Sequence, residues 1–277
     1  MLTQQVALVS EVPGFDFSAL TAVSAALQKQ VSRDVAPIWG IQSTVDAFQS
    51  LDDVPLGYWP LVITNQPLGN AAGVHMDQDG QPYALVEVSD SWSLTASHEC
   101  LEMLVDPYGS RTIAGPSPKA DQGRVEFLVE VCDPCEDAAF AYTVNDVLVS
   151  DFYTPHFFDP TAGDDVAYSF SQAIKAPRQV LNNGYLSWHD PMSDEWWQRT
   201  MFNGDQQDRN LGTITNRGER SLREWVNGRT PGHLEATRLK KDHAVLKRAI
   251  GHQSQSRHAA SAKAKRLRTR VAQLLQR

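Results

Sequence analysis

Apolar positions recur with two different periods over the first ninety residues. Residues 5–12 (QVALVSEV) form a short apolar run that is typical of a buried strand. Residues 16–35 instead carry apolar side chains at helical spacing, from Phe17 to Val31, and predict an amphipathic helix. Two further strands and a hairpin are predicted at residues 37–48, 60–65 and 71–89.

The segment SLTASHECLEMLVDPYG, residues 93–109, predicts a second helix. Asp90 or Ser91 is a suitable N-cap, and Pro107 ends the segment. The expected order is strand, helix, strand, strand, hairpin, helix, which indicates an α+β fold.

The pattern in residues 123–137 (GRVEFLVEVCDPCED) can be read in two ways. Strand alternation would mix acidic and apolar residues on one face, whereas helical spacing separates them. We therefore expect a helix that ends at Pro134 and carries Glu126, Glu130 and Asp133 on its acidic face. Beyond it we expect hairpins around Asn145-Asp146 and Asn183-Gly184, and a polar loop at residues 193–221.

The C-terminal segment is basic and amphipathic. Residues 238–277 contain twelve Lys and Arg against one acid, Asp242, and Leu239, Leu246 and Leu267 recur in one heptad register. The rest of the chain is acidic, so the net charge of −8 combines two oppositely charged parts. We expect a globular domain at residues 1–200, a polar linker at 201–237 and a basic helical tail at 238–277.

Composition narrows the class of protein. With 42% hydrophobic and 21% charged residues, the chain resembles ordinary globular proteins with a sizeable core. No apolar run reaches the roughly 18 to 20 residues that span a bilayer, and the N-terminus lacks the basic region of a secretory signal. Cys100, Cys132 and Cys135 are too few for a disulfide framework and are expected to be reduced, partly buried thiols. These features favour a cytoplasmic location.

Within the second predicted helix, His98, Glu99 and Glu102 form an H-E-x-x-E motif. Residues four apart share one face of a helix, so His98 and Glu102 could hold one metal ion with Glu99 beside it. A carboxylate binds zinc at about 2.0 to 2.2 Å, so Glu102 is a competent ligand. Glu99 would then accept a proton from the water that the metal activates and pass it to the leaving amine.

A catalytic site of this kind needs a third protein ligand. Asp106 lies eight residues after His98, about 12 Å along a helix, so it is better placed as a helix end-cap or as a hydrogen-bond partner of a ligand. The acidic face of residues 126–133 is the strongest alternative source. We expect Glu130 to bind the metal and Asp133 to orient one of its ligands.

These motifs resemble those of known metallopeptidases. A strand before an HExx-bearing helix resembles the zincins, and a third ligand on a later helix resembles their gluzincin branch. The stretches SHECLEMLVDPYG, EVCDPCED and VSDFYTPHFF also resemble bacterial proteins of largely unassigned function, in which HExxE is followed by Asp-Pro and then by E-x-x-D. The likeness covers roughly residues 5–190. It implies a zincin-like mixed sheet with an edge strand over the HExxE helix, zinc on His98, Glu102 and Glu130, and Glu99 as general base.

The chain departs from the gluzincin pattern at two points. Glu102 stands where the second His of HExxH is found, and E-x-x-D replaces E-x-x-x-D. A site of one imidazole and two carboxylates is harder than most zinc sites, so manganese or iron is an alternative metal.

Peptide hydrolysis also needs a hydrogen-bond donor for the developing oxyanion and a surface for the peptide or protein substrate. Residues 83–89 are expected to be an edge strand with which the substrate pairs. The candidate donors are Tyr108, Tyr153 and His156, with His75 and His189 as weaker ones.

The basic tail has three interpretations. It could pack on the acidic body, bind nucleic acid or an anionic membrane surface, or dock on a partner protein through its Leu stripe. Its expected contacts are Lys263, Lys265, Arg266, Arg268 and Arg270. The sequence therefore predicts a metal-dependent peptidase, with zinc as the expected metal. The alternative is a non-catalytic structural or assembly component whose tail binds a partner protein or nucleic acid.

Overall fold

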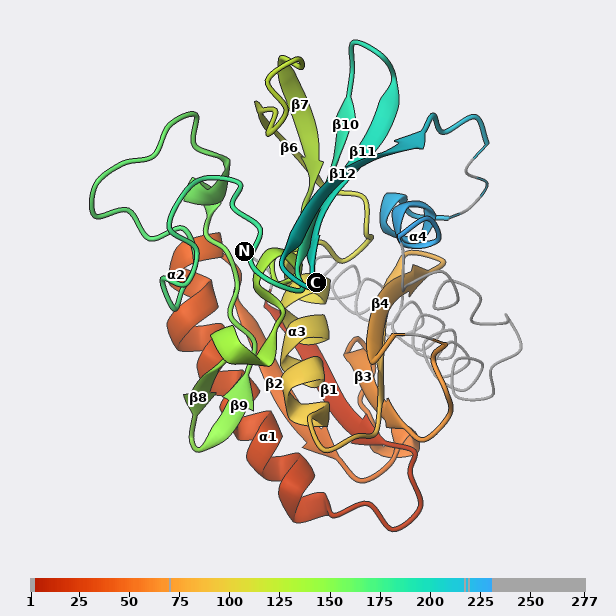
Figure 1. Ribbon diagram of the computed structural model, residues 1–277. Coiled ribbons are helices and arrows are strands. Elements are labelled where there is room, and N and C mark those ends of the chain that lie inside the picture. The colour runs from red at the N-terminus through yellow and green to blue at the C-terminus, as the bar shows by residue number, and fades with distance from the viewer. Residues whose placement is uncertain (1–2, 70, 217, 219, 231–277) are drawn as a thin grey trace, which may run out of the picture.

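Two five-stranded sheets, with helices packed between and beside them, make a mixed α+β fold (Figure 1). The structure is a computed structural model and describes residues 3–69, 71–216, 218 and 220–230. None of the helices in this part of the chain is long and apolar enough to cross a membrane. The expected basic tail at residues 238–277 lies outside the described residues, together with the five cations proposed as its contacts.

The first sheet has the strand order β2-β1-β3-β5-β4. Neighbouring strands are parallel except β4, which runs antiparallel to β5 at the edge. The hairpin of β4 and β5 is confirmed, but the expectation that residues 83–89 form an edge strand is wrong. The hairpin places its second strand in the interior, where it pairs with β3, and leaves its first strand outside. The bounds are β1 (Gln4–Ser10), β2 (Ser43–Phe48), β3 (Trp59–Thr64), β4 (Gly73–Gln78) and β5 (Gln81–Glu87).

Strands of the first sheet are buried on both faces. On β1, Val6 and Leu8 pack into the main core, whereas Val9 packs into a second cluster on the opposite face. On β3, Ile63 and Val62 divide in the same way. A strand that is covered on both faces needs apolar residues at every position, which is why its sequence appears as a continuous apolar run.

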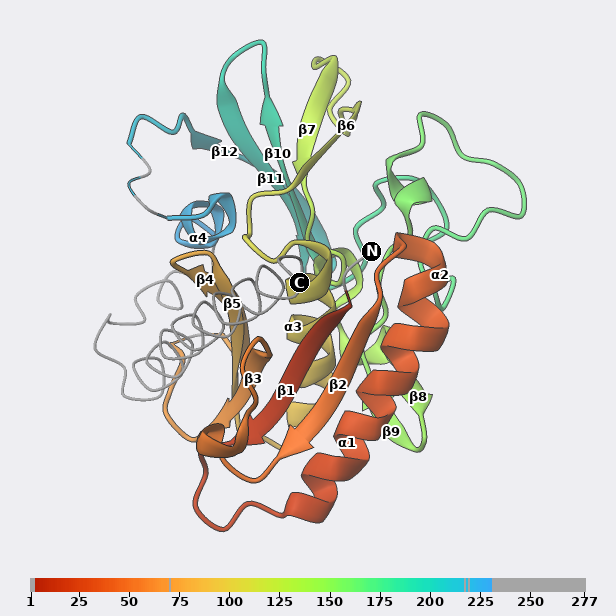
Figure 2. The same cartoon turned by 180° about the vertical axis from the view of Figure 1, so that it is seen from behind.

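Two long helices pack against this sheet. Helix α1 (Phe17–Lys29) lies on β1 and β2, and helix α3 (Trp92–Val105) lies on β3, β4 and β5 (Figure 2). Asp16 caps α1 by accepting a hydrogen bond from the backbone of Ser18. Both helices were predicted, and Ser91 and Asp106 flank α3 as expected. The strand expected at residues 37–48 is shorter, because a π-helical turn (Gln30–Val35) and helix α2 (Ala36–Trp39) continue the first helix.

The second sheet is antiparallel throughout, with the order β12-β11-β10-β7-β6. It stands beyond one end of α3, as Figure 1 shows. Its strands come from two separate parts of the sequence, so the pairing of β7 with β10 joins distant segments. The bounds are β6 (Thr112–Pro116), β7 (Arg124–Leu128), β10 (Tyr185–Asp190), β11 (Glu195–Phe202) and β12 (Asp205–Gly212).

The helix expected at residues 126–134 is wrong. This stretch contains strand β7, an extended buried segment and a single 3-10 turn at Asp133–Cys135. In the sequence, the acidic and apolar residues that share one face of this stretch argued against a strand. In the structure, both kinds of side chain have partners from distant parts of the chain. Leu128 packs with Trp225, and the buried Glu130 pairs with Arg223, which lies far along the chain.

The hairpin predicted at Asn145-Asp146 is confirmed as β8 (Tyr142–Val144) and β9 (Val147–Val149). The hairpin predicted at Asn183-Gly184 is wrong, because that turn only leads into β10, whose partners are β11 and β7. The loop expected at residues 193–221 is also wrong, since β11 and β12 form a hairpin there. Its turn, Asn203-Gly204, has positive φ at both residues, and Asn-Gly is the commonest sequence for such a turn.

The region expected to be a linker contains strand β12 and helix α4 (Leu222–Asn227). Ser221 and Glu224 form a capping box at the start of α4. Trp225 and Val226 then bury the helix against Leu128 and Trp196 of the second sheet. The chain up to residue 230 is therefore integrated with the two sheets.

All three cysteines are buried free thiols, with Cys100 and Cys132 fully buried and Cys135 1% exposed. Burial raises the pKa of Cys100 to about 12 and also raises the pKa values of the other two thiols. We expect a thiol reagent such as DTNB to leave the native protein unmodified at mildly alkaline pH and to report all three thiols after unfolding in guanidinium chloride. Fast modification of the native protein would contradict this burial.

Candidate metal centre

Helix α3 places the three residues of the H-E-x-x-E motif beside strand β4. The prediction that His98 and Glu102 share a face is confirmed, because His98 Nε2 lies 3.3 Å from Glu102 Oε2. Glu102 is fully buried and Glu99 is 3% exposed. The apolar side of α3 is held in the main core by residues such as Leu101 and Val105, so the motif has a fixed position over the cleft beside β4.

The segment that follows β7 brings further carboxylates to the same place. The 3-10 turn at Asp133–Cys135 directs Asp133 toward α3, and its Oδ1 lies 3.3 Å from His98 Nε2. The backbone of Cys132 donates to Glu102 Oε1 at 3.2 Å, which fixes this segment against the helix. Asp133, which was expected to orient a ligand of the metal, therefore lies beside His98.

Four groups of side chains in the described part of the chain have donor atoms within 4.8 Å of one another. No group contains both His98 and Glu130, so the structure does not bring together the expected set of His98, Glu102 and Glu130. Asp133 stands in a group with His98 instead. The groups are His98–Glu102–Cys132, His75–Glu99–Glu102, His98–Asp133–Glu136 and Glu102–Glu130–Asp133.

Arg223 of helix α4 enters the same cluster and is 5% exposed. Its Nη2 lies 3.0 Å from Glu102 Oε2, and its Nη1 lies 3.4 Å from Glu99 Oε2. Its Nε lies 2.7 Å from Glu130 Oε2, at ion-pair distance but without the alignment of a hydrogen bond. Nη1 also donates to Nδ1 of His75 at 2.5 Å, so that nitrogen acts as an acceptor.

The cluster contains more acidic than basic side chains. Burial would raise the pKa of Glu99, but the charges of Arg223 and His98 outweigh it, and the pKa is lowered. Burial raises the pKa of Glu130, and Glu102 and Asp133 add to this effect against Arg223. Burial and the neighbouring Glu102 raise the pKa of Asp133 to about 6. Arg223 therefore favours the ionised form of Glu99, whereas Glu130 and Asp133 hold their protons more tightly than usual.

Several buried polar atoms in this cluster lack a hydrogen-bond partner. They are both carboxylate oxygens of Glu130, both of Asp133, and Nε2 of His75. Leaving such groups buried and unsatisfied costs about 1–3 kcal/mol each, and more for charged groups. One imidazole and several carboxylates make a donor set that suits zinc, manganese or iron, and a divalent cation would satisfy the carboxylate oxygens of Asp133. The residues present therefore fit a metal ion.

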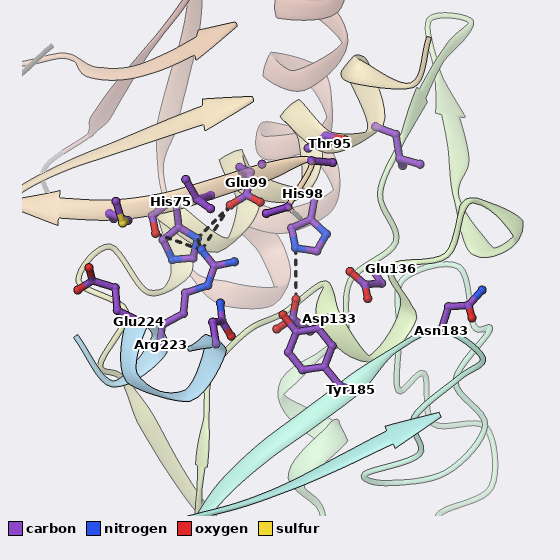
Figure 3. Close-up of a pocket in the computed structure, with 17 residues that line it drawn as sticks. His75, Thr95, His98, Glu99, Asp133, Glu136, Asn183, Tyr185, Arg223 and Glu224 are labelled. Carbon is purple, nitrogen blue, oxygen red and sulfur yellow. Dashed lines mark hydrogen bonds and ion pairs between the residues drawn. The ribbon is translucent and has the colours of Figure 1, made fainter. Parts of the chain in front are cut away.

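The cluster opens on a cavity of about 240 Å³ between α3, β4, the 133–136 turn, the start of β10 and α4 (Figure 3). His98, Glu99 and Asp133 lie in its wall, so the buried cluster has one face toward the cavity. Figure 3 shows His98 and Asp133 pointing toward each other in the middle, with Arg223 on one side and Glu136 on the other. The cavity has enough room for part of a peptide as well as water.

A glycine allows β4 to approach the motif. A Cβ at Gly73 would lie 2.6 Å from Thr95 Cγ2 and 2.8 Å from Glu99 Cγ, so the strand and α3 would have to separate. We expect Gly73→Ala to lower the free energy of unfolding by about 1–3 kcal/mol, as overpacking does, and to displace Glu99. Urea denaturation measures the loss. Gly123→Ala is the matched control, because its Cβ would meet nothing within 4 Å, and an equal loss in both variants would contradict the prediction.

A second close approach places Tyr185 in the cavity wall. A Cβ at Gly184 would lie 2.7 Å from the carbonyl oxygens of both Asp133 and Pro134, so only glycine lets β10 begin against this turn. Tyr185 follows at once and lines the cavity. Burial raises its pKa, and the charges of Asp133 and Glu136 raise it further, so the phenol keeps its proton as a hydrogen-bond donor.

Of the expected oxyanion donors, the structure brings His75 to the cavity wall but not Tyr108, Tyr153, His156 or His189. Tyr108 is half exposed elsewhere, and the exposed His156 pairs with Asp159. Tyr153 is fully buried behind the cluster, and its hydroxyl lacks a hydrogen-bond partner. His189 lies on the second sheet beside Glu126. Asp106 caps the end of α3 and accepts a hydrogen bond from the backbone of Arg111 at 2.9 Å, as expected of an end-cap.

Four residues of the centre were not predicted as functional or were ranked low. His75 was among the weaker candidates, and Glu136, Tyr185 and Arg223 were not singled out. A signal for Arg223 does exist, because Ser221 and Glu224 form an S-x-x-E capping box around it in the sequence. Comparison of the chain with protein-family models, curated proteins and solved structures found no match.

Proposed function

We propose that this protein is a metal-dependent peptidase whose metal ion binds His98, Asp133 and Glu136. The observation that carries the proposal is the carboxylate of Asp133. It is 2% exposed, has no hydrogen-bond partner, lines the cavity and lies 3.3 Å from His98. Glu102, which lies 3.3 Å from His98 on the same helix, is the alternative ligand, together with the softer Cys132 in the same group.

Asp133 replaces Glu130 as a ligand in this proposal. Glu130 is occupied by Arg223 and does not line the cavity, whereas Asp133 faces both His98 and the cavity. Zinc remains the expected metal. Manganese or iron is the alternative, because carboxylates suit these harder metals and three of the four donors nearest to one another, Glu102, Asp133 and Glu136 beside His98, are carboxylates.

The surrounding residues supply the other parts of a hydrolytic site. Such a cation, when bound, polarises a carbonyl group and makes water more acidic. The carboxylate of Glu99 lies in the cavity wall and would accept the proton from water and deliver it to the leaving amine. Tyr185 would donate a hydrogen bond to the carbonyl oxygen as negative charge develops there.

Strand β4 supports a peptide as the substrate. It is the antiparallel edge strand beside the motif helix, and its residues 73–76 line the cavity. An edge strand offers backbone hydrogen-bond donors and acceptors to an extended peptide without strong side-chain selectivity. An HExxE helix under such a strand is the arrangement that the resemblance to zincins implies.

The experiment is a comparison of metal content and peptide hydrolysis. We expect protein purified without added metal to contain about one transition-metal ion per chain and to lose hydrolysis of a generic peptide library in a chelator. His98→Ala and Asp133→Asn should lose the metal, whereas Glu130→Gln should keep it. His156→Ala is the control, since that histidine is exposed and far from the cavity. A metal-free native protein, or retention of metal in Asp133→Asn, would overturn the assignment.

A further inference from the structure

Glu102 stands between two sets of metal-binding donors. Its Oε2 lies 3.3 Å from His98 Nε2 and 3.6 Å from His75 Nδ1. His98 belongs to one group with Asp133 and Glu136, and His75 belongs to another with Glu99 and Glu102. A carboxylate between two such groups is the arrangement of a two-metal hydrolase, in which the ions lie about 3.5–4 Å apart.

The guanidinium of Arg223 already occupies the second group. Nη1 lies 2.5 Å from His75 Nδ1 and 3.4 Å from Glu99 Oε2, and Nη2 lies 3.0 Å from Glu102 Oε2. Each residue of the His75–Glu99–Glu102 group therefore has a donor atom against this guanidinium. The first group differs, because no hydrogen bond or ion pair of Arg223 to His98, Asp133 or Glu136 is found among the described residues.

We propose that Arg223 takes the place of a second metal ion, so that the centre binds one divalent ion beside a permanent cation from the chain. A guanidinium is suited to this role, because it stays charged at every physiological pH and donates up to five hydrogen bonds in a plane. Here its three nitrogens reach three different glutamates. With a second metal ion in place of the guanidinium, the protein would have to bind two ions, rather than one, to form the complete centre.

Residues of both groups line the cavity, at different parts of its wall. The group that Arg223 fills lies toward α4, and Figure 3 shows His75, Glu99 and Arg223 gathered on that side. The His98–Asp133–Glu136 group lies toward Tyr185, where a substrate carbonyl could enter. This inference rests on the proposed metal centre, but it does not depend on peptide hydrolysis.

The test is the number of metal ions bound by neutral variants of Arg223. We expect wild-type protein titrated with Mn²⁺ to bind one ion per chain by native mass spectrometry and calorimetry. Arg223→Ala should bind two, and its electron paramagnetic resonance spectrum should show an exchange-coupled pair of Mn²⁺ ions. Adding Glu99→Gln to Arg223→Ala should remove the second ion, and Arg223→Lys should bind one ion, as the wild type does.

Every outcome bears on the inference. Two ions in the wild type, or one in a folded Arg223→Ala, would overturn it. Because Arg223→Ala could unfold without metal, Arg223→Gln is the second variant, and both are refolded with excess Mn²⁺. Failure of both to fold under those conditions would also count against the inference, since a second metal should replace the lost charge. If the neutral Arg223 variants bind two ions and the wild type one, but the wild type does not hydrolyse peptides, only the proposed peptidase activity is contradicted. If the wild type hydrolyses peptides but the variants still bind one ion, only this inference is contradicted.

Discussion

Replacing Glu99 by Gln should lower the rate of peptide hydrolysis by about 10²- to 10⁴-fold and leave the metal content unchanged. Gln has nearly the same shape as Glu but cannot accept a proton at its side-chain nitrogen or act as a base. Glu99 lies in the cavity wall, and its contact with Arg223 holds its carboxylate in place. Steady-state kinetics on a peptide substrate and elemental analysis of the same sample measure the two quantities.

Glu224→Gln is the matched control for this variant. Glu224 also lines the cavity, but its carboxylate accepts the backbone N–H of Ser221 in the capping box of α4, which Gln can also do. Hydrolysis by Glu224→Gln should stay within a few-fold of the wild type. Full activity in Glu99→Gln would show that another group moves the proton. Loss of metal in that variant would mean that Glu99 is itself a ligand.

Replacing Arg223 by Met should lower the free energy of unfolding in the presence of EDTA by about 3–5 kcal/mol, the usual cost of breaking a buried ion pair. Met fills much of the space of the arginine stem, so the loss reports the charge more than the packing. Glu99, Glu102 and Glu130 would lose their common counter-ion at 3%, 0% and 6% exposure. Denaturation by urea, followed by tryptophan fluorescence, measures the change.

Arg199→Met provides the comparison for a less buried pair. Arg199 makes two hydrogen bonds to Asp208, at 2.7 and 2.8 Å, on the outer part of the second sheet. Pairs of this kind contribute about 0–1 kcal/mol because water screens them. An equal loss in the two variants would contradict the view that Arg223 compensates the carboxylates. Addition of a divalent metal should restore part of the stability of Arg223→Met but leave Arg199→Met unaffected.

The sequence was sufficient for the first half of the fold because local patterns there coincide with tertiary contacts. The apolar runs of β1 and β3 and the spacing of α1 and α3 each appear within one short window. The prediction failed at residues 123–137, where the helical and strand periods divide the side chains almost equally well. Pairing of β7 with β10 and β6 decides between them, and those partners are distant or come earlier in the chain. The hairpin of β11 and β12 was missed although Asn203-Gly204 marks its turn.

The residues of the candidate site also differ in whether local sequence could identify them. His98, Glu99 and Glu102 could be identified from one turn of helix, because their spacing alone puts them together. The choice between Glu130 and Asp133 could not be made, since it depends on which carboxylate meets Arg223 and which meets His98. Arg223 follows Glu102 by 121 residues, and no local pattern reports a contact of that length.

That separation has a consequence for how the protein reaches its native state. Proteins rich in contacts between distant residues fold slowly, since the intervening chain must first be ordered at an entropic cost. Here β10 and β11 must assemble before α4 has a surface on which to dock, because Trp225 rests on Trp196. Until then, the acidic side chains around His98 repel one another without their guanidinium. We therefore expect the docking of α4 to be a late, rate-limiting event in folding of the described part of the chain, and an early supply of divalent cations to accelerate it.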